Sequence, residues 1–154
     1  MSAQPVFLIV GASLAGAKAA EELRTQGFDG RVVLIGTEPE RPYERPPLTK
    51  DYLRGESERE KAYVHPDGFY AQQEIELETG VTVTGIEPGA SRVTLADGRV
   101  LGYDRLLLAT GAEPVRLPLP GMDLPHVHTL RTLGDSRAII ARAATTRRAV
   151  VMGA

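Results

Sequence analysis

Two apolar runs, joined by a glycine-containing turn and a stretch of small residues, constrain this chain more than any other feature. The runs are VFLIV at residues 6–10 and VVLI at residues 32–35. Because they are apolar throughout and do not alternate, they are typical of strands covered on both faces of a parallel sheet. Between them, Ala15, Ala19 and Leu23 recur every four residues and predict a helix with one narrow apolar face. The stretch therefore predicts a strand, a helix and a parallel strand.

The turn GASLAG follows the first run. Gly11 permits a tight turn, and Gly16 permits close packing of the helix on the strand. Leu14 and Ala15 complete the turn. Because the helix begins inside this loop, the free N–H groups and the positive dipole end of the helix face an anion such as a pyrophosphate. Ser13 replaces the middle glycine of the GxGxxG pattern, and its hydroxyl can donate a hydrogen bond to a phosphate oxygen.

An acidic residue, Glu38, follows the second run, about 20 residues beyond the last glycine of the turn. Its carboxylate can accept hydrogen bonds from both hydroxyls of a ribose and would repel a 2′-phosphate. The stretch therefore favours binding of the AMP moiety of FAD or NAD over that of NADP. The alternative interpretation is an ordinary strand–helix–strand turn followed by a surface glutamate.

The composition is that of one soluble globular domain of 154 residues, 42% hydrophobic and 25% charged. Eighteen basic and twenty acidic residues give a net charge of −2, so nothing indicates binding to nucleic acid or to a membrane surface. No leading or long apolar run indicates export or a membrane span, and the expected location is the cytoplasm. Cysteine is absent, which excludes disulfides, thiolate metal sites and a thiol redox centre. His126 and His128 alternate without a third ligand, so no metal site is expected.

A proline-rich segment, RPYERPPLTK at residues 41–50, is the second informative stretch. Its prolines fix φ and remove N–H donors, so residues 41–47 are expected to be stiff and extended. Thr49 is expected to cap a short helix that begins at Lys50. Two interpretations stay open: a rigid segment whose Arg41, Arg45 and Lys50 hold an extended anionic ligand, or a solvated loop.

A third strand of the parallel sheet is expected where a leucine-rich run meets Ala109-Thr110-Gly111. The small residues let the backbone approach a ligand, although a plain strand-ending turn is the alternative. Residues 75–78 alternate and suit an edge of the sheet, and Asp97-Gly98 is a turn signal that predicts an antiparallel hairpin.

The remaining segments predict helices and a linker. Gly27 suits the left-handed position that ends the first helix, as in a Schellman cap. Short helices are expected at residues 69–73 and 132–142, and a proline-rich linker at residues 114–125.

Together, GASLAGAKAAEELR and RVVLIGTEPERPYERPPLTKDYL strongly resemble the FAD-dependent ferredoxin reductases of aromatic-ring dioxygenase and cytochrome P450 systems, and their rubredoxin reductase relatives. The resemblance runs across nearly all of the chain, and RPYERPPLTK is its most specific part. It implies an α/β, Rossmann-like FAD-binding domain with a parallel sheet and a small antiparallel meander.

By this resemblance, further positions are assigned to FAD. Lys50 would lie near the isoalloxazine, where a cation stabilises the negative charge that arriving hydride builds on the ring. Arg45 would lie toward the diphosphate, and the backbone around Val83 would pack on the adenine. The segment 109–111 would form part of the FAD wall, with Arg116 near the flavin.

The resemblance also implies the reaction and the extent of the enzyme. NADH would pass a hydride to FAD, and single electrons would then leave for a ferredoxin or rubredoxin-type iron–sulfur protein. Residues 1–117 would belong to the FAD-binding domain, residues 118–147 would be a linker and helix, and residues 148–154 would be the first strand of an NAD(P)H-binding domain. The chain is then the amino-terminal portion of a larger flavoenzyme and is expected to be inactive by itself.

Two other functions stay open on the sequence. The chain could be a non-catalytic binding or scaffold unit that holds FAD weakly or not at all. It could also be an NAD-only dehydrogenase domain, although Arg45, Lys50 and the Ala-Thr-Gly segment speak against that.

Overall fold

The computed structural model describes residues 4–152, which form two compact units. The first unit contains residues 4–44 and 63–111, and the second contains residues 45–62 and 112–152.

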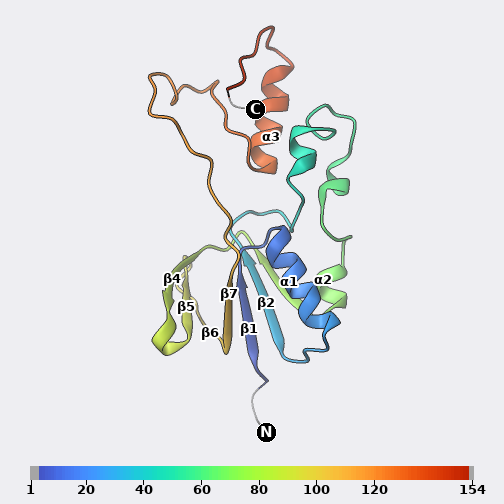
Figure 1. Ribbon diagram of the computed structural model, residues 1–154, viewed down its shortest axis with the longest axis vertical. Helices are drawn as coiled ribbons and strands as arrows, with labels where there is room; N and C mark the ends of the chain where they lie inside the picture. Colours follow the sequence, from blue (N-terminus) through green and yellow to red (C-terminus); the bar gives the residue numbers. More distant parts are fainter. Residues whose placement is uncertain (1–3, 153–154) are drawn as a thin grey trace. The chain divides into compact units, whose positions relative to one another are not determined.

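A four-stranded parallel sheet forms the centre of the first unit (Figure 1). Its strand order is β3-β2-β1-β7, so β3 and β7 are the edges. The strands are β1 (Val6–Val10), β2 (Arg31–Gly36), β3 (Ile75–Thr79) and β7 (Arg105–Leu108). The parallel sheet predicted from the unbroken apolar runs is confirmed, as is the edge position of residues 75–78.

Two helices cover one face of this sheet. They are α1 (Leu14–Thr25) and the short α2 (Phe69–Gln72), and both fall where the sequence predicts helices. Ala17 and Ala20 of α1 join Ile9 and Leu34 of the sheet, together with Tyr70 of α2, in one buried cluster. Small side chains on α1 let its backbone lie close to the strands, which is why an alanine-rich helix can form a tight core here.

The buried face of α1 differs from the predicted one. Its buried residues are Gly16, Ala17 and Ala20, whereas Ala15 is exposed. The four-residue spacing was counted from the wrong position, because Gly16 is the residue that touches the strand: a Cβ there would lie 3.0 Å from a Leu34 methyl carbon. Ala19 and Leu23 flank the true face and are partly buried.

The other face of the parallel sheet is covered by a three-stranded antiparallel sheet of order β4-β5-β6. Leu8, Val33 and Ile35 of the parallel sheet pack with Val93 and Leu95 of β5 in a second buried cluster. The predicted hairpin at Asp97-Gly98 joins two of these strands. They are β4 (Val83–Glu87), β5 (Arg92–Leu95) and β6 (Val100–Gly102), with a short 3₁₀ turn η3 (Pro88–Ala90) before β5.

The second unit consists of short helical segments around α3 (Leu133–Ala143). Two 3₁₀ turns, η1 (Pro46–Thr49) and η2 (Arg59–Ala62), precede it in the chain. The buried Ser136 of α3 donates a hydrogen bond of 3.2 Å to the Leu48 carbonyl and so ties α3 to η1. The predicted helix at residues 132–142 is confirmed.

The prediction for the proline-rich segment is only partly right. Its extended part ends at Glu44, where the chain passes from the first unit to the second. The prediction of a helix that begins at Lys50 is wrong, because the helical turn of this segment is η1, which begins at Pro46. Thr49 does not cap a helix; its hydroxyl donates a hydrogen bond to the Pro46 carbonyl. Proline is favoured at the first position of a helical turn, which explains a start at Pro46.

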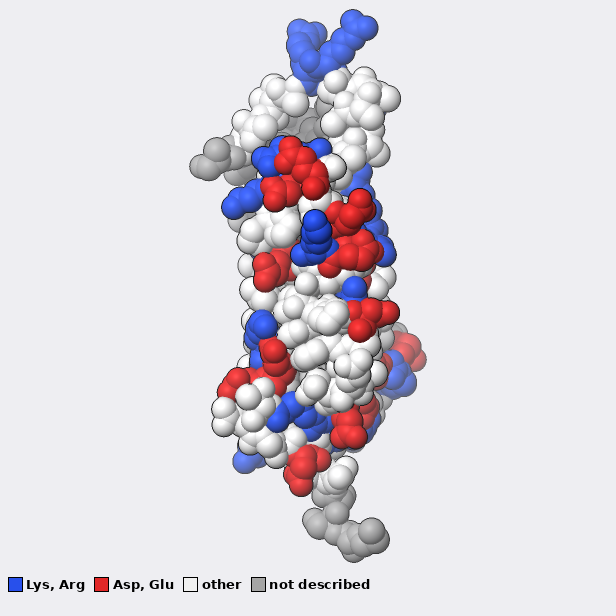
Figure 2. Space-filling model, turned by 90° about the vertical axis from the view of Figure 1, so that its right-hand side faces the viewer, with Lys and Arg blue, Asp and Glu red and all other residues white. Residues whose placement is uncertain are grey.

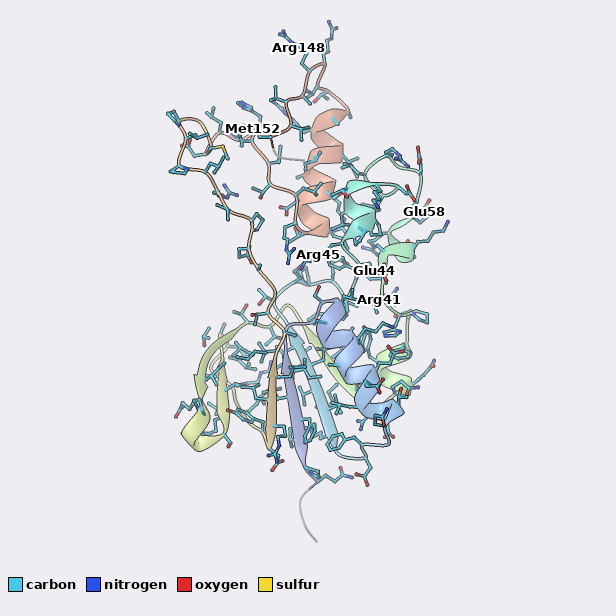
Figure 3. The ribbon with its side chains drawn as sticks, viewed as in Figure 1. Arg41, Glu44, Arg45, Glu58, Arg148 and Met152 are labelled. Atoms are coloured by element: carbon cyan, nitrogen blue, oxygen red, sulfur yellow. The ribbon has the colours of Figure 1, made fainter. Side chains whose placement is uncertain are left out.

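Two later segments have no regular structure. Residues 109–132 carry no helix or strand, in keeping with the proline-rich linker expected there. Residues 149–152, expected to begin a strand, are also irregular, and their apolar side chains are largely exposed. Figure 3 labels Met152 in this segment and Arg148 directly before it. A strand needs a hydrogen-bonded neighbour, and none of the described residues supplies one. Gly153 and Ala154 lie outside the described residues.

The end of α1 is a Schellman cap, as predicted. Gly27 has φ +77°, its N–H donates to the Arg24 carbonyl at 3.0 Å, and the Phe28 N–H donates to the Leu23 carbonyl at 3.0 Å.

Arg24, in the last turn of α1, fastens two loops to the helix. Its guanidinium donates hydrogen bonds to the carbonyl oxygens of Phe28 at 2.6 Å and Gly30 at 2.8 Å in the loop before β2. It also donates to those of Gln73 at 2.8 Å and Glu74 at 2.7 Å in the loop before β3. One side chain thus fixes the entry of two neighbouring strands.

Replacing Arg24 with methionine should lower the free energy of unfolding by about 2 kcal/mol, because the charge-assisted bonds to four carbonyls are lost together. Urea unfolding followed by circular dichroism measures this change. Arg92→Met is the matched control, because the Arg92–Glu87 pair at 3.1 Å is solvent-exposed and such pairs contribute less than about 1 kcal/mol. Equal losses in the two variants would contradict the role given to Arg24.

Candidate functional site

The carboxyl ends of three parallel strands meet at one edge of the first unit. The Ala109 N–H donates to the Val10 carbonyl at 2.7 Å, which joins the end of β7 to the end of β1. The Gly11 N–H donates to the Ile35 carbonyl at 2.8 Å, which joins the turn after β1 to β2. The glycine turn, the start of the segment that leads to Glu38, and the Ala-Thr-Gly segment therefore lie side by side, at the end of the sheet where α/β folds bind ligands.

The glycine turn is packed so closely that two of its positions have no room for a side chain. Gly11 has φ +118°, and a Cβ there would lie 2.1 Å from the carbonyl oxygen of Ala109. A Cβ on Gly16 would lie 2.0 Å from the carbonyl oxygen of Gly11. Gly36, at the end of β2, similarly leaves room for the methyl group of Ala12. These contacts give a physical reason for the two glycines that the sequence singled out.

The amino end of α1 opens at the same edge. Ser13 is the N-cap residue, its backbone is extended, and its side chain makes no capping hydrogen bond. The first turn of α1 carries no acidic residue, and its Leu14 and Ala15 are exposed. The first N–H groups of a helix have no partner within it, so this end presents donors and a positive dipole to a ligand.

Glu38 is half-buried beyond the end of β2. The Gly80 N–H donates to its backbone carbonyl at 2.9 Å, and the Tyr43 hydroxyl donates a hydrogen bond to its carboxylate. Nearby, the hydroxyls of Thr37 and Thr82 are hydrogen-bonded at 3.3 Å. The carboxylate is therefore held in place by side-chain and backbone contacts of its own unit.

The other predicted residues of this unit lie in two different surroundings. Thr110 and Gly111 are exposed, whereas Ala109 packs against the cluster beneath α1. Val83, at the start of β4, packs against the cluster under the antiparallel sheet, so its side chain is explained as core. A role of its backbone toward a ligand stays a prediction.

Arg45, Lys50 and Arg116 belong to the second unit. Arg45 is half-buried and donates a hydrogen bond to the Arg131 carbonyl (Figure 3 labels Arg45). Lys50 follows η1 as its C-cap residue and is exposed, as is Arg116. The structure therefore brings the turn and the Ala-Thr-Gly segment together, while the placement of these three cations toward them stays a prediction.

Arg131 is a candidate functional residue that the sequence analysis did not identify. The Nε atom of its guanidinium is buried and has no hydrogen-bond partner among the described residues. Arg131 directly precedes Thr132, the N-cap of α3, which forms a capping box with Asp135. Thr132 followed three residues later by an acid is the sequence pattern of a capping box. This pattern could have located the helix start and, directly before it, an arginine with a fixed backbone.

Asp135 holds this part of the second unit together. Burial alone would raise the pKa of its carboxyl, but hydrogen bonds from the N–H groups of Thr132 at 2.8 Å and Arg131 at 2.9 Å lower it instead. The positive charge of Arg116 adds to the lowering of this pKa. The ionised form of the carboxylate is thus favoured by these two N–H groups and by the charge of Arg116.

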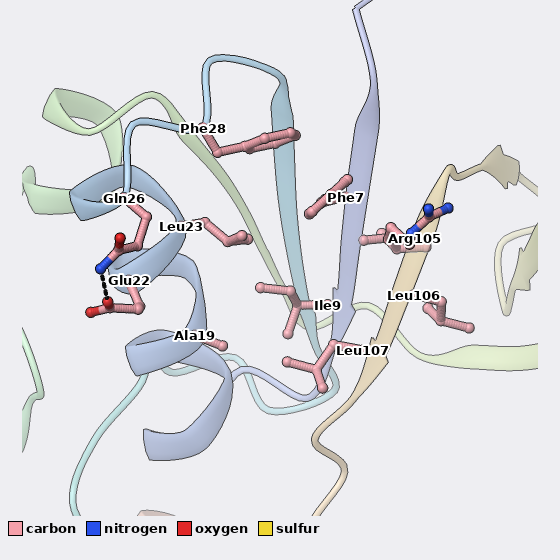
Figure 4. A pocket seen from close by; sticks show the side chains of 11 residues that line it. Phe7, Ile9, Ala19, Glu22, Leu23, Gln26, Phe28, Arg105, Leu106 and Leu107 are labelled. Atoms are coloured by element: carbon pink, nitrogen blue, oxygen red, sulfur yellow. Dashed lines mark hydrogen bonds between the residues drawn. The ribbon is translucent and has the colours of Figure 1, made fainter.

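Two hollows in the first unit lie away from the glycine turn. An apolar one of about 360 Å³ lies between the carboxyl end of α1 and strands β1 and β7, with Leu23, Phe28 and Leu107 among its lining residues (Figure 4). Another of about 480 Å³ lies between α2, β3 and residues 39–41. Neither contains the glycine turn or Glu38, so neither marks the edge that the strand ends form.

Neither sign of charge dominates the face drawn in Figure 2. On the face in Figure 2, basic and acidic side chains are interspersed over most of the surface. Among residues 4–152, no group of three potential ligands could hold a metal ion, and no helix has the length and apolarity to cross a membrane.

Comparisons with known proteins agree with this architecture. The sequence profile of the pyridine nucleotide-disulphide oxidoreductases matches residues 6–154. Rhodocoxin reductase of Rhodococcus erythropolis is 42% identical over 148 residues, which are 96% of this chain and 35% of that protein. Putidaredoxin reductase of Pseudomonas putida is 39% identical over 156 residues, covering 99% of this chain and 37% of that protein.

A solved structure is similar over the same region. The ferredoxin reductase for the CYP199A2 system from Rhodopseudomonas palustris superposes with a TM-score of 0.86 at 37% identity, covering 90% of this chain and 34% of that one. This chain thus spans about a third of the length of the relatives it matches.

Gly11→Ala should lower the free energy of unfolding by more than about 3 kcal/mol or prevent folding, because its methyl group would overlap the Ala109 carbonyl and its φ is positive. Urea unfolding measures the loss. The control is Gly89→Ala, where a Cβ would meet nothing within 4 Å, and it should stay within about 0.5 kcal/mol of the unchanged protein. If both variants were equally stable, the close approach of the turn to β7 would be wrong.

Proposed function

Because the chain belongs to the pyridine nucleotide-disulphide oxidoreductase family, we propose that the strand-end edge of the first unit binds the adenosine diphosphate half of FAD. We propose further that the chain is the FAD-binding portion of an NADH-dependent ferredoxin or rubredoxin reductase. The observation that carries this proposal is the glycine turn, whose backbone leaves no room for a Cβ at Gly11 or Gly16 and ends at the open amino end of α1.

The residues at this edge fit the chemistry of a dinucleotide. A pyrophosphate needs N–H donors and a positive end of a helix dipole, which the first turn of α1 offers at Ser13, Leu14 and Ala15. A ribose needs a fixed hydrogen-bond acceptor, which Glu38 offers. The exposed Thr110 offers a small hydroxyl beside the turn.

The cations of the second unit are assigned to the rest of the cofactor. When bound, FAD accepts a hydride and releases single electrons, with negative charge developing on its ring. We assign the exposed Lys50 to that ring as the one catalytic residue, because a fixed ammonium stabilises such charge, and Arg116 to its surroundings. Arg45, held by the Arg131 carbonyl, is assigned to the diphosphate.

The relatives support the rest of the proposal. Rhodocoxin reductase and putidaredoxin reductase are named for the proteins that they reduce, and the corresponding partner proposed here is a ferredoxin or rubredoxin-type iron–sulfur protein. The proposed electron donor is NADH and the proposed location is the cytoplasm. Residues 1–117 would serve the FAD-binding domain, residues 118–147 a linker and helix, and residues 148–154 the start of an NAD(P)H-binding domain.

A second candidate is a non-catalytic unit that holds FAD without turnover. The observation that favours it is that this chain spans about a third of its relatives, and a ligand that misses part of its contacts binds weakly. Activity of the 154-residue chain alone does not separate the two candidates, because a portion of a reductase is also expected to be inactive by itself. A hybrid in which this chain replaces the matching 35% of rhodocoxin reductase separates them. NADH oxidation by the FAD-loaded hybrid would support the reductase portion, whereas a folded, FAD-loaded hybrid without NADH oxidation would support the non-catalytic unit.

Titration of the 154-residue chain with FAD, followed by quenching of flavin fluorescence, tests the proposal. Saturable binding is expected, and Glu38→Ala should raise the Kd for FAD about fivefold to tenfold, because the ribose loses a charged acceptor. Glu40→Ala is the matched control, since this acid two residues away accepts a hydrogen bond from Tyr63 and has no assigned ligand role.

Two results would count against the proposal. One is an unchanged chain that is folded but shows no saturable FAD binding. The other is a Kd that rises as much in Glu40→Ala as in Glu38→Ala. Greater protection from thermal unfolding by NAD than by FAD would favour an NAD-only domain instead.

A further inference from the structure

We infer that Tyr43 is a positioning residue of the nucleotide site, whose hydroxyl holds the Glu38 carboxylate where it meets the ribose. The inference rests on the proposed function and gives a role to Tyr43, which is not among the site residues predicted from the sequence. It concerns the first unit alone, since both residues belong to it.

The contact itself is direct. The Tyr43 hydroxyl donates a hydrogen bond to Oε2 of Glu38. Tyr43 is only 3% exposed, so its phenol is enclosed by protein and has a defined position. A carboxylate has about four acceptor sites on its two oxygens, so a bond from a phenol is compatible with further bonds from ribose hydroxyls.

The backbone on both sides of Tyr43 is also held. Tyr43 forms a bridge with Tyr63, and the Val64 N–H donates to the Pro42 carbonyl at 3.0 Å. Pro42 is buried and its ring fixes φ. The phenol therefore projects from a backbone segment whose position is fixed. In the first unit, the proline-rich segment places the Tyr43 side chain beside Glu38.

Fixing a glutamate matters for binding because the free side chain samples many rotamers. A ligand that orders such a side chain loses part of its affinity to the lost rotamer freedom. The Gly80 N–H anchors the Glu38 backbone carbonyl at 2.9 Å, and the Tyr43 hydroxyl anchors the carboxylate at the other end. Glu38 is thus held both at its backbone and at its carboxylate, so the carboxylate is already in position when the nucleotide binds.

A neighbouring pair offers an internal control. The Tyr63 hydroxyl donates to Oε2 of Glu40 at 2.7 Å, and the Arg41 guanidinium lies 3.9 Å above the Tyr63 ring. Tyr63→Phe therefore removes a similar phenol–carboxylate bond on the bridged partner of Tyr43 without touching Glu38.

The test compares ADP with 2′,3′-dideoxy-ADP, which lacks both ribose hydroxyls. Binding to the ¹⁵N-labelled 154-residue chain is followed by amide chemical shifts, which also report whether each variant is folded. The unchanged chain should bind ADP more tightly than the dideoxy compound. Tyr43→Phe should raise the Kd for ADP about fivefold and leave the Kd for dideoxy-ADP unchanged, whereas Tyr63→Phe should change neither.

A Tyr43→Phe variant that binds ADP as tightly as the unchanged chain would overturn the inference alone. Equal weakening of both ligands would also overturn it, because a purely structural role predicts that result. If the unchanged chain does not distinguish the two ligands, the ribose assignment of Glu38 fails and the inference fails with it.

The unchanged chain supplies a second measurement that does not depend on folding of a variant. The hydroxyl proton of Tyr43 should shift on addition of ADP and not on addition of dideoxy-ADP, because only ADP bonds to the carboxylate that accepts this proton. An equal response to both ligands would contradict the positioning role.

Discussion

The close approach of the glycine turn to the end of β7 is the constraint on which the first unit depends. With the Gly11 Cβ position 2.1 Å from the Ala109 carbonyl oxygen, β1 and β7 can pair to their ends only if residue 11 is glycine. The same turn starts α1, and Gly16 lets that helix lie against it. The absence of a Cβ at Gly11 and Gly16 thus permits the pairing of β1 with β7, the placement of α1 and the open amino end of this helix.

Much of this architecture could be predicted because it is encoded locally. The apolar runs of β1 and β2 predict strands covered on both faces, and the structure covers one face with α1 and the other with the antiparallel sheet. The Asp97-Gly98 turn and the Gly27 cap depend on backbone conformations that few residues adopt, so short sequences suffice to locate them. The carboxyl-end position of the glycine turn then follows from parallel pairing.

What the sequence did not reveal depends on side-chain hydrogen bonds that have no repeating sequence pattern, whether the partners are near or far apart in the chain. The bonds from Arg24 to four carbonyls and from Tyr43 to Glu38 join residues with no local pattern. The buried face of α1 was misjudged by one residue because alanine and glycine give a weak hydrophobic contrast. The start of η1 at Pro46 shows that a proline, favourable at the first helical position, outweighed the capping tendency of Thr49.

A crystal structure of the 154-residue chain grown with ADP would test the central claim most directly. The account predicts density for the diphosphate against the N–H groups of Ser13, Leu14 and Ala15, and ribose hydroxyls within hydrogen-bond distance of the Glu38 carboxylate. Density for ADP at another place, with the glycine turn empty and intact, would contradict it.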